Sequence, residues 1–68
     1  MKRIARMTSK AGRLLPEGWS RIYTVRGGEK GRGRAIATHE GSGNVGRDLA
    51  CDLAAQLARD LGYTVLAE

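Results

Sequence analysis

Residues 45–61, Val-Gly-Arg-Asp-Leu-Ala-Cys-Asp-Leu-Ala-Ala-Gln-Leu-Ala-Arg-Asp-Leu, decide the fold because they carry the clearest helical pattern of the 68-residue chain. At about 100° per residue, apolar side chains gather on one face and polar ones on the other. The apolar face holds Leu49, Ala50, Leu53, Ala54, Leu57 and Leu61, and the opposite face holds Asp48, Asp52, Ala55 and Arg59. The pattern predicts an amphipathic helix whose leucines and alanines face the core.

The residues on either side of this segment mark its ends. Asn44 is a good N-cap, and Gly62 stands where a helix commonly ends in a left-handed residue. Tyr63-Thr-Val-Leu66 then has the β-branched and aromatic character of a short strand.

Two further strands are expected before the helix. Residues 19–26 and 34–39 are rich in β-branched and aromatic side chains, and the stretch 27–33 between them contains four glycines. This pattern predicts a β-hairpin with a long, flexible and cationic tip. Trp19 and Tyr23 share one face of the first strand, which favours packing in the core.

The first 15 residues show neither a helical nor a strand period, and they mix Lys and Arg with isolated apolar residues. We expect them to form a basic N-terminal arm, with order beginning at the turn that follows Pro16. Residues 16–68 then make up a single small domain. Its predicted class is α+β, with a β-β-α-β order in which the hairpin and a C-terminal strand pack on one amphipathic helix.

Composition limits the kinds of function. A chain this short buries only about 60% of the surface that its unfolded form exposes, which disfavours a deep catalytic cleft. His39 lies near no recognisable nucleophile motif, and the single cysteine, Cys51, lacks a thiol partner for a disulfide or a zinc site. No stretch is apolar enough for a signal peptide or a membrane span. We therefore expect a cytoplasmic protein that is not an enzyme and uses no cofactor or metal.

Charge is divided unevenly along the chain. Residues 1–34 hold ten Lys and Arg against two Glu, whereas residues 35–68 hold two Arg against five Asp and Glu. The positive half is typical of a protein that meets a polyanion, and a major groove admits a two-stranded ribbon. We predict a nucleic-acid-binding protein, with DNA favoured over RNA. The expected contact residues are Arg21, Tyr23, Arg26, Lys30, Arg32 and Arg34 of the hairpin and Lys2 and Arg3 of the arm.

Residues 13–61 support this prediction by a resemblance. The Arg13-Leu-Leu-Pro-Glu-Gly-Trp19 segment, the basic hairpin and the Ala/Leu-rich helix resemble the arm-type DNA-binding domain of phage integrases. They are also similar to methyl-CpG-binding and plant ethylene-response domains. The resemblance implies a three-stranded sheet that enters the major groove, with the helix packed behind it.

A second resemblance involves Gly41-Ser-Gly-Asn-Val-Gly46, which fits the G-x-G-x-x-G pattern between a predicted strand and a predicted helix. Together with Glu68, it is similar to the first βαβ unit of dinucleotide-binding proteins. The resemblance implies that Gly41, Gly43 and Gly46 let a pyrophosphate approach and that Glu68 binds a ribose. We consider this the least favoured function, because a glycine-rich loop before a helix has a simpler structural explanation.

A different class of function also fits the chain. Small proteins with polarised charge, of a kind that phages and plasmids encode, often act by docking on an acidic surface of another protein, as inhibitors do. The C-terminal strand could pair with the sheet edge of such a partner or with a second copy of the chain, and a homodimer would enlarge a small core. Salt dependence separates the two classes, since phosphate binding weakens steeply with salt.

Overall fold

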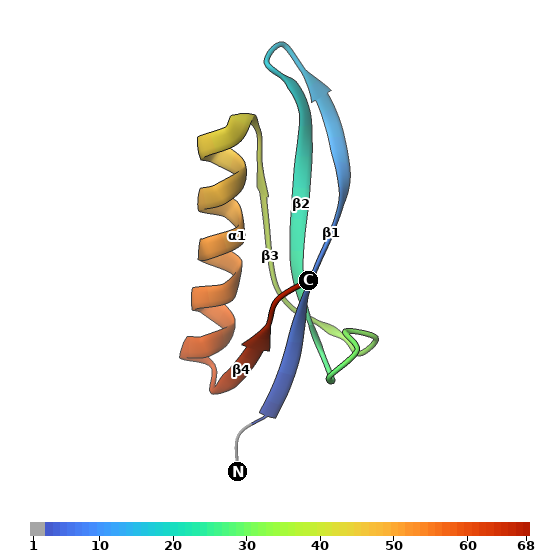
Figure 1. The fold of residues 1–68 in the computed structure, drawn as a ribbon, viewed down its shortest axis with the longest axis vertical. Coiled ribbons are helices and arrows are strands. Elements are labelled where there is room, and N and C mark those ends of the chain that lie inside the picture. Colours follow the sequence, from blue (N-terminus) through green and yellow to red (C-terminus); the bar gives the residue numbers. More distant parts are fainter. Residues whose placement is uncertain (1–2) are drawn as a thin grey trace.

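The computed structural model describes residues 3–68. These residues form a four-stranded sheet with one helix on one of its faces (Figure 1). The elements are β1 (Arg3–Leu15), β2 (Gly18–Gly27), β3 (Ala35–Gly41), α1 (Gly43–Asp60) and β4 (Tyr63–Leu66), and the order across the sheet is β3-β2-β1-β4. The predicted α+β class is confirmed, as are the hairpin, the helix and the last strand.

The structure differs from the sequence prediction at residues 3–15, which form strand β1 instead of an arm. β1 lies inside the sheet, antiparallel to β2 on one side and parallel to β4 on the other. Ala5 and Met7 are buried against the helix, while Arg6 and Thr8, which alternate with them, belong to the opposite face. The alternation specifies a strand, but Ala5 and Met7 are its only apolar members on the buried face before Ser9, and it is therefore a weak signal.

The connections between the strands are unlike one another. Pro16 and Glu17 make the expected turn, after which Leu15 pairs with Gly18 to open the β1–β2 ladder. The segment from Gly28 to Arg34 does not project as a free tip. A Cβ atom added at Gly31 would lie 3.1 Å from Thr8 Cγ2 and 3.2 Å from Arg6 Cβ, so this loop rests on the sheet.

Helix α1 begins and ends largely where the sequence indicates. Its N-cap is Ser42, two residues before the expected Asn44, and the Ser42 hydroxyl donates to Glu17 at 3.1 Å instead of capping the helix. The helix ends at Leu61, and Gly62 has the positive φ of 95° that reverses the chain into β4.

The leucines of α1 were expected to face the sheet, but the face that packs on the sheet is formed by alanines. Ala50, Ala54, Ala55 and Ala58 are the buried residues of the helix, whereas Leu49, Leu53 and Leu57 are 55%, 51% and 44% exposed. A helix with alanines at its contact can approach a sheet closely, because only methyl groups separate the two backbones. The core consists of these alanines with Ala5, Met7, Val25 and Ala37.

The β1–β2 hairpin extends beyond the N-terminal end of α1, which makes the molecule elongated, with extents of 44 × 19 × 14 Å (Figure 1). Leu14 and Trp19 pair across its tip and are 66% and 58% exposed. Trp19 was predicted to pack in the core, but it lies outside it. Tyr23, for which the same was predicted, is half-buried and packs against the core.

Candidate nucleic-acid interface

The sheet has one face covered by α1 and one face that the helix leaves free, which we call the open face. Strand alternation and the pairing register assign its residues. They are Arg6, Thr8 and Lys10 of β1, Ser20, Ile22, Thr24 and Arg26 of β2, and Thr38 and Glu40 of β3. Ser20 and Thr24 are buried within it, and most of the other side chains are polar or basic.

A row of threonines crosses the middle of the open face from strand to strand. The Thr8 hydroxyl donates to the Thr24 carbonyl at 2.9 Å, and the Thr38 hydroxyl lies 3.3 Å from that of Thr24. Thr24 is buried, so the half-buried Thr8 and the exposed Thr38 are the members that offer neutral hydrogen-bonding groups between the charged positions.

Two arginines stand directly opposite each other on the open face, Arg6 on β1 and Arg26 on β2. Like charges at paired positions of neighbouring strands are destabilising. Each guanidinium is held by main-chain carbonyls: Arg26 Nη1 donates to Gly33 at 3.2 Å, and Arg6 Nη1 donates to Ala67 at 2.6 Å. These carbonyls accept from some of the guanidinium donors and leave both positive charges in place, so an anion at this point would relieve their repulsion.

The loop that follows β2 adds cations beside this pair. Arg6 Nε donates to the Glu29 carbonyl of the loop, and the buried Gly31 rests on Arg6 and Thr8. Lys30 and Arg32 flank Gly31 and are exposed. Of the residues that the sequence predicts for binding, Arg26, Lys30 and Arg32 therefore lie on or beside the open face.

Arg21 and Tyr23 lie elsewhere, because alternation along β2 turns them toward the helix side of the sheet. Arg21 Nε donates to the Ser9 hydroxyl at 3.1 Å. Both residues line a shallow hollow together with Arg47 and Asp48 from the start of α1. The structure thus separates these two from Arg26, although all three belong to one strand.

Arg3 and Arg34 gather around Tyr63 at the other end of the helix. The Arg3 guanidinium lies 5.6 Å from the centroid of the Tyr63 ring, and Nη1 is 3.4 Å from the hydroxyl. Hydrogen bonding from Arg3, and to a smaller extent from Arg34, lowers the pKa of Tyr63 below its ordinary value. Lys2, also predicted to bind, lies outside the described residues.

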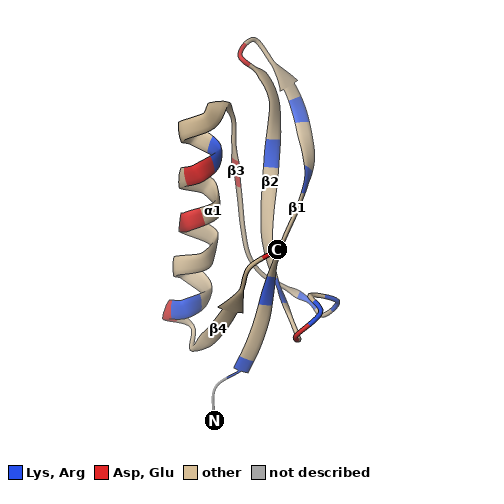
Figure 2. Cartoon of the chain, in the orientation of Figure 1, with Lys and Arg blue, Asp and Glu red and all other residues tan. Residues whose placement is uncertain are grey.

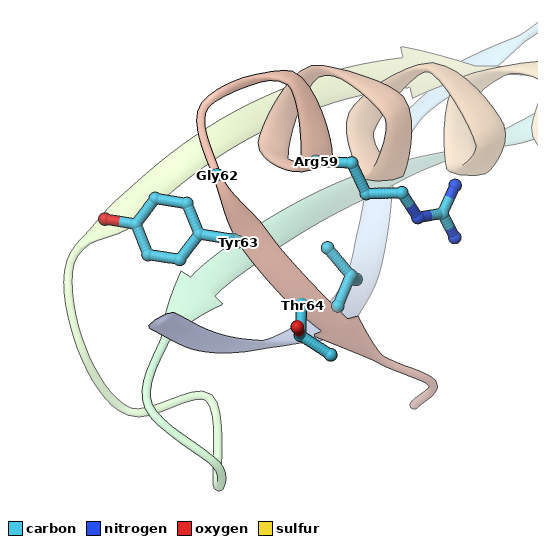
Figure 3. A pocket seen from close by; sticks show the side chains of 5 residues that line it. Arg59, Gly62, Tyr63 and Thr64 are labelled. Atoms are coloured by element: carbon cyan, nitrogen blue, oxygen red, sulfur yellow. The ribbon is translucent and has the colours of Figure 1, made fainter. Parts of the chain in front are cut away.

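Figure 3 shows this end of the molecule, where Gly62 leads from α1 into β4 and the Tyr63 side chain points away from that of Arg59. The hollow drawn there is lined by Arg59, Gly62, Tyr63, Thr64 and Val65. Its only charged lining residue is one arginine, so it resembles a surface depression more than a built binding site.

The acidic residue on the open face is Glu40, and its charge is compensated. Glu40 accepts hydrogen bonds from the Ser20 hydroxyl and from Arg13 Nε, the latter at 3.1 Å. The bond from Ser20, followed by that from Arg13, lowers the pKa of Glu40. The carboxylate therefore stays ionised but adds little net negative charge to the face.

Sequence reasoning missed Arg6 and Lys10 as candidate contact residues because it placed them in an unstructured arm. The signal that could have found them is the alternation of Ala5, Met7 and Ser9 with Arg6, Thr8 and Lys10. That period of two predicts a strand with one face of polar and basic side chains.

The glycine pattern at residues 41–46 has structural causes. A Cβ at Gly41 would collide with the Gly46 carbonyl and lie 2.9 Å from Ala50 Cβ, so β3 and α1 meet too closely for a side chain. Glu68 accepts a hydrogen bond from Ser9 at 2.8 Å. β3 and β4 lie at opposite edges of the sheet, whereas successive strands of the dinucleotide-binding unit are neighbours.

Charge is separated in space as well as in sequence (Figure 2). The strands and the loop after β2 carry most of the Lys and Arg residues, while α1 carries Asp48, Asp52 and Asp60 together with Arg47 and Arg59. The sheet side is therefore the one that attracts an anion.

Two further searches concern the residues that the structure describes. No group of three or more His, Cys, Asp and Glu side chains within residues 3–68 lies close enough to hold a metal ion. Within the same range, no helix has the length and apolar character needed to cross a membrane. Cys51 is half-buried, and burial raises the pKa of its thiol, which disfavours the reactive thiolate.

Comparison of the chain with protein-family models, with curated proteins and with solved structures finds no significant match in any of the three. The geometry described above therefore carries the functional argument by itself.

Proposed function

We propose that this protein binds duplex nucleic acid, DNA in preference to RNA, through the open face of β1, β2 and β3. The observation that carries the proposal is the pair of opposed arginines, Arg6 and Arg26, with Lys10, Lys30 and Arg32 around it. A phosphate at this position would be attracted by both positive charges and would offset their mutual repulsion.

The dimensions of the sheet suit a major groove. β4 pairs only with residues 3–6 of β1, so beyond that point the sheet is three-stranded. Neighbouring strands lie about 4.8 Å apart, so three strands span about 10 Å between their outer backbones, and the major groove of B-DNA is about 12 Å wide. In this arrangement Thr8 and Thr38 would face the base edges and the cations would face phosphates.

The order of elements also supports the proposal. Integrase arm-type DNA-binding domains, which the sequence resembles, have a three-stranded sheet that enters the groove and a helix packed behind it. Here β1, β2 and β3 precede α1, and the helix covers the face opposite the open one. DNA is favoured over RNA because the major groove of A-form RNA is too deep and narrow to admit a sheet.

The test compares two variants that each lose two positive charges. Lys10→Gln/Arg26→Gln removes cations from the open face, and Arg47→Gln/Arg59→Gln removes them from α1. Fluorescence anisotropy measures the affinity of each variant and of wild type for a labelled duplex over a range of salt concentrations. We expect the open-face variant alone to bind more weakly and to lower the slope of log K against log salt by about 1.8, at about 0.9 per phosphate contact.

Two results would overturn the proposal. Equal effects of both variants would mean that net charge, and not the open face, governs binding. Absence of binding by the wild-type protein to duplex DNA, single-stranded DNA and RNA would leave an acidic protein surface as the partner to search for.

A further inference from the structure

Helix α1 has a period of four that runs through its whole sequence, Val45-Gly-Arg-Asp, Leu49-Ala-Cys-Asp, Leu53-Ala-Ala-Gln, Leu57-Ala-Arg-Asp, Leu61-Gly. Every fourth residue is a large aliphatic one, and we call this row the leucine ridge. Its members Val45, Leu49, Leu53, Leu57 and Leu61 are 73%, 55%, 51%, 44% and 58% exposed. The row that follows each of them by one position is made of glycine and alanine.

The large aliphatic side chains of the helix thus lie outside while the core is built from small ones. Among the described residues, Val25 and Ser20 are the largest side chains that are fully buried. A domain of this size is marginally stable even with a well-filled core. Burial of the leucine ridge is therefore the largest hydrophobic gain still open to this molecule.

No element of residues 3–68 is placed to cover the ridge. The buried alanines hold α1 on the sheet, and the ridge lies roughly 130° around the helix from their mean direction at 100° per residue. A rotation of α1 that buried the leucines would expose the alanines and drive the larger side chains against Gly41, where even a methyl group does not fit. The ridge needs a partner from outside the chain.

We propose that a second copy of this protein covers the leucine ridge and forms a symmetric dimer through α1. A two-fold interface brings the same patch of both copies together and must complement itself. The ridge meets this requirement, because a two-fold axis that runs along the helices sets each of its side chains, with Leu53 in the middle, against the same side chain of the second copy.

The size of the patch agrees with this occupant. Five side chains exposed to this extent make a patch of about 300–600 Å², the range of the largest apolar patch on a typical monomer. With the flanking side chains the contact approaches about 800 Å² per copy, the usual value for a stable interface. The total accessible surface of the chain is 4685 Å², so the required area of about 800 Å² is about a sixth of it.

The spacing of the ridge also specifies how two helices would meet. Residues four apart form ridges inclined to the helix axis, and when such ridges of two helices interdigitate the axes cross at about −50°. Asp48, Asp52 and Asp60 flank the ridge on one side, and Arg34 shares a hollow with Leu61 on the other. A two-fold axis that runs along the helix pair places Asp60 of each copy toward the Arg34 side of the other copy, at the Leu61 end of the ridge.

The test uses the full-length protein without nucleic acid, so its result is independent of the proposed DNA binding. Sedimentation equilibrium measures the mass of wild type, Leu53→Asp and Leu14→Asp between about 1 and 100 µM, where a dimer of moderate affinity dissociates. Leu14, at the hairpin tip, is a matched control because it is as exposed as the ridge residues. We expect wild type and Leu14→Asp to approach twice the chain mass of 7.3 kDa, and Leu53→Asp to stay at the single mass.

A second measurement keeps the test valid if Leu53→Asp does not fold. Circular dichroism monitors the thermal unfolding of the wild-type protein at several concentrations. The midpoint of wild-type unfolding should rise with protein concentration, because association stabilises the native state by mass action. A wild-type protein that remains at the single chain mass, with a midpoint independent of concentration, would overturn the proposal. Dimers of equal strength in wild type and Leu53→Asp would do the same.

Discussion

The open face of the sheet and the leucine ridge of α1 are both exposed, yet they differ in what they need. On the open face Arg6 and Arg26 already donate to main-chain carbonyls. The ridge presents aliphatic side chains that neither water nor the chain itself can satisfy. The difference teaches that one surface is suited to a charged, exchangeable ligand and the other to a lasting contact.

Gly41 lies at the contact between β3 and α1, the elements that carry these two surfaces, and we expect the largest loss of stability from a substitution there. Gly41→Ala forces a methyl group against the Gly46 carbonyl and Ala50 Cβ, which separates α1 from β3. The substitution should destabilise the fold by about 3 kcal/mol or more, as overpacking does at its upper end. Denaturant unfolding measures the loss.

Gly46 of the same glycine pattern provides the matched control. A Cβ there meets no atom within 4 Å, so Gly46→Ala should raise stability by about 0.5–1 kcal/mol through its better helix propensity. If Gly41→Ala is as stable as Gly46→Ala, the close approach of α1 to β3 at Gly41 is contradicted.

The next largest effect concerns DNA binding and compares the cations of the loop after β2 with those on the helix side of the sheet. Lys30→Gln/Arg32→Gln removes cations from the loop over the open face, and Arg21→Gln/Arg47→Gln removes two from the helix side. We expect only the loop variant to lower the salt slope of DNA binding, by up to about 1.8. A larger loss from the Arg21 variant would shift the interface to the helix side of the sheet.

A smaller effect concerns pH and the acidic group of the open face. Because the folded pKa of Glu40 lies below its ordinary value of 4.5, the bonds from Ser20 and Arg13 stabilise the native state above that pH. This contribution is lost as the pH falls from 4.5 through the lowered folded value. Glu40→Gln should therefore be less stable than wild type in urea at pH 7, with the gap closing at acid pH. A stability difference that stays the same at acid pH would show that the Glu40 carboxylate is not the source of this stabilisation.

The smallest effect is a change in the pKa of Tyr63, which lies beside Arg3, Arg34 and the last ridge residue, Leu61. In a Tyr23→Phe background, ultraviolet absorbance follows the ionisation of Tyr63. Arg3→Gln should raise the pKa of Tyr63 toward its ordinary value of 10.0, and Arg34→Gln should do so less. An unchanged pKa in the Arg3 variant would show that the guanidinium does not stay on the ring.

The sequence predicts the helix, the β2–β3 hairpin and β4 because each carries a strong local signal. It fails at β1, where the residues turned toward the helix are as small as Ala5 and the period of two is hard to recognise. It also places the leucines in the core, because on a helical wheel Leu53 and Ala54 fall within about 100° of each other. Only the space available at Gly41 decides which row is buried.

The candidate site was predictable in part. Charge alone selects Arg26, Lys30 and Arg32, which the structure brings to the open face. Arg21 could be set apart from Arg26 by strand parity, since five residues along a strand reverse the direction of a side chain. The pairing of Arg6 with Arg26 joins residues twenty positions apart, and it depends on the register of a strand that the sequence did not reveal.

The most direct test of the central claim is an NMR titration of the ¹⁵N-labelled protein with a short DNA duplex at low salt. We predict that the amide signals that move belong to the open face and its loop, among them Thr8, Lys10, Thr24, Arg26 and Arg32, while those of Leu49, Leu53 and Leu57 stay in place. Shifts concentrated on α1, or no shifts at all, would contradict the assignment of the open face as a nucleic-acid interface.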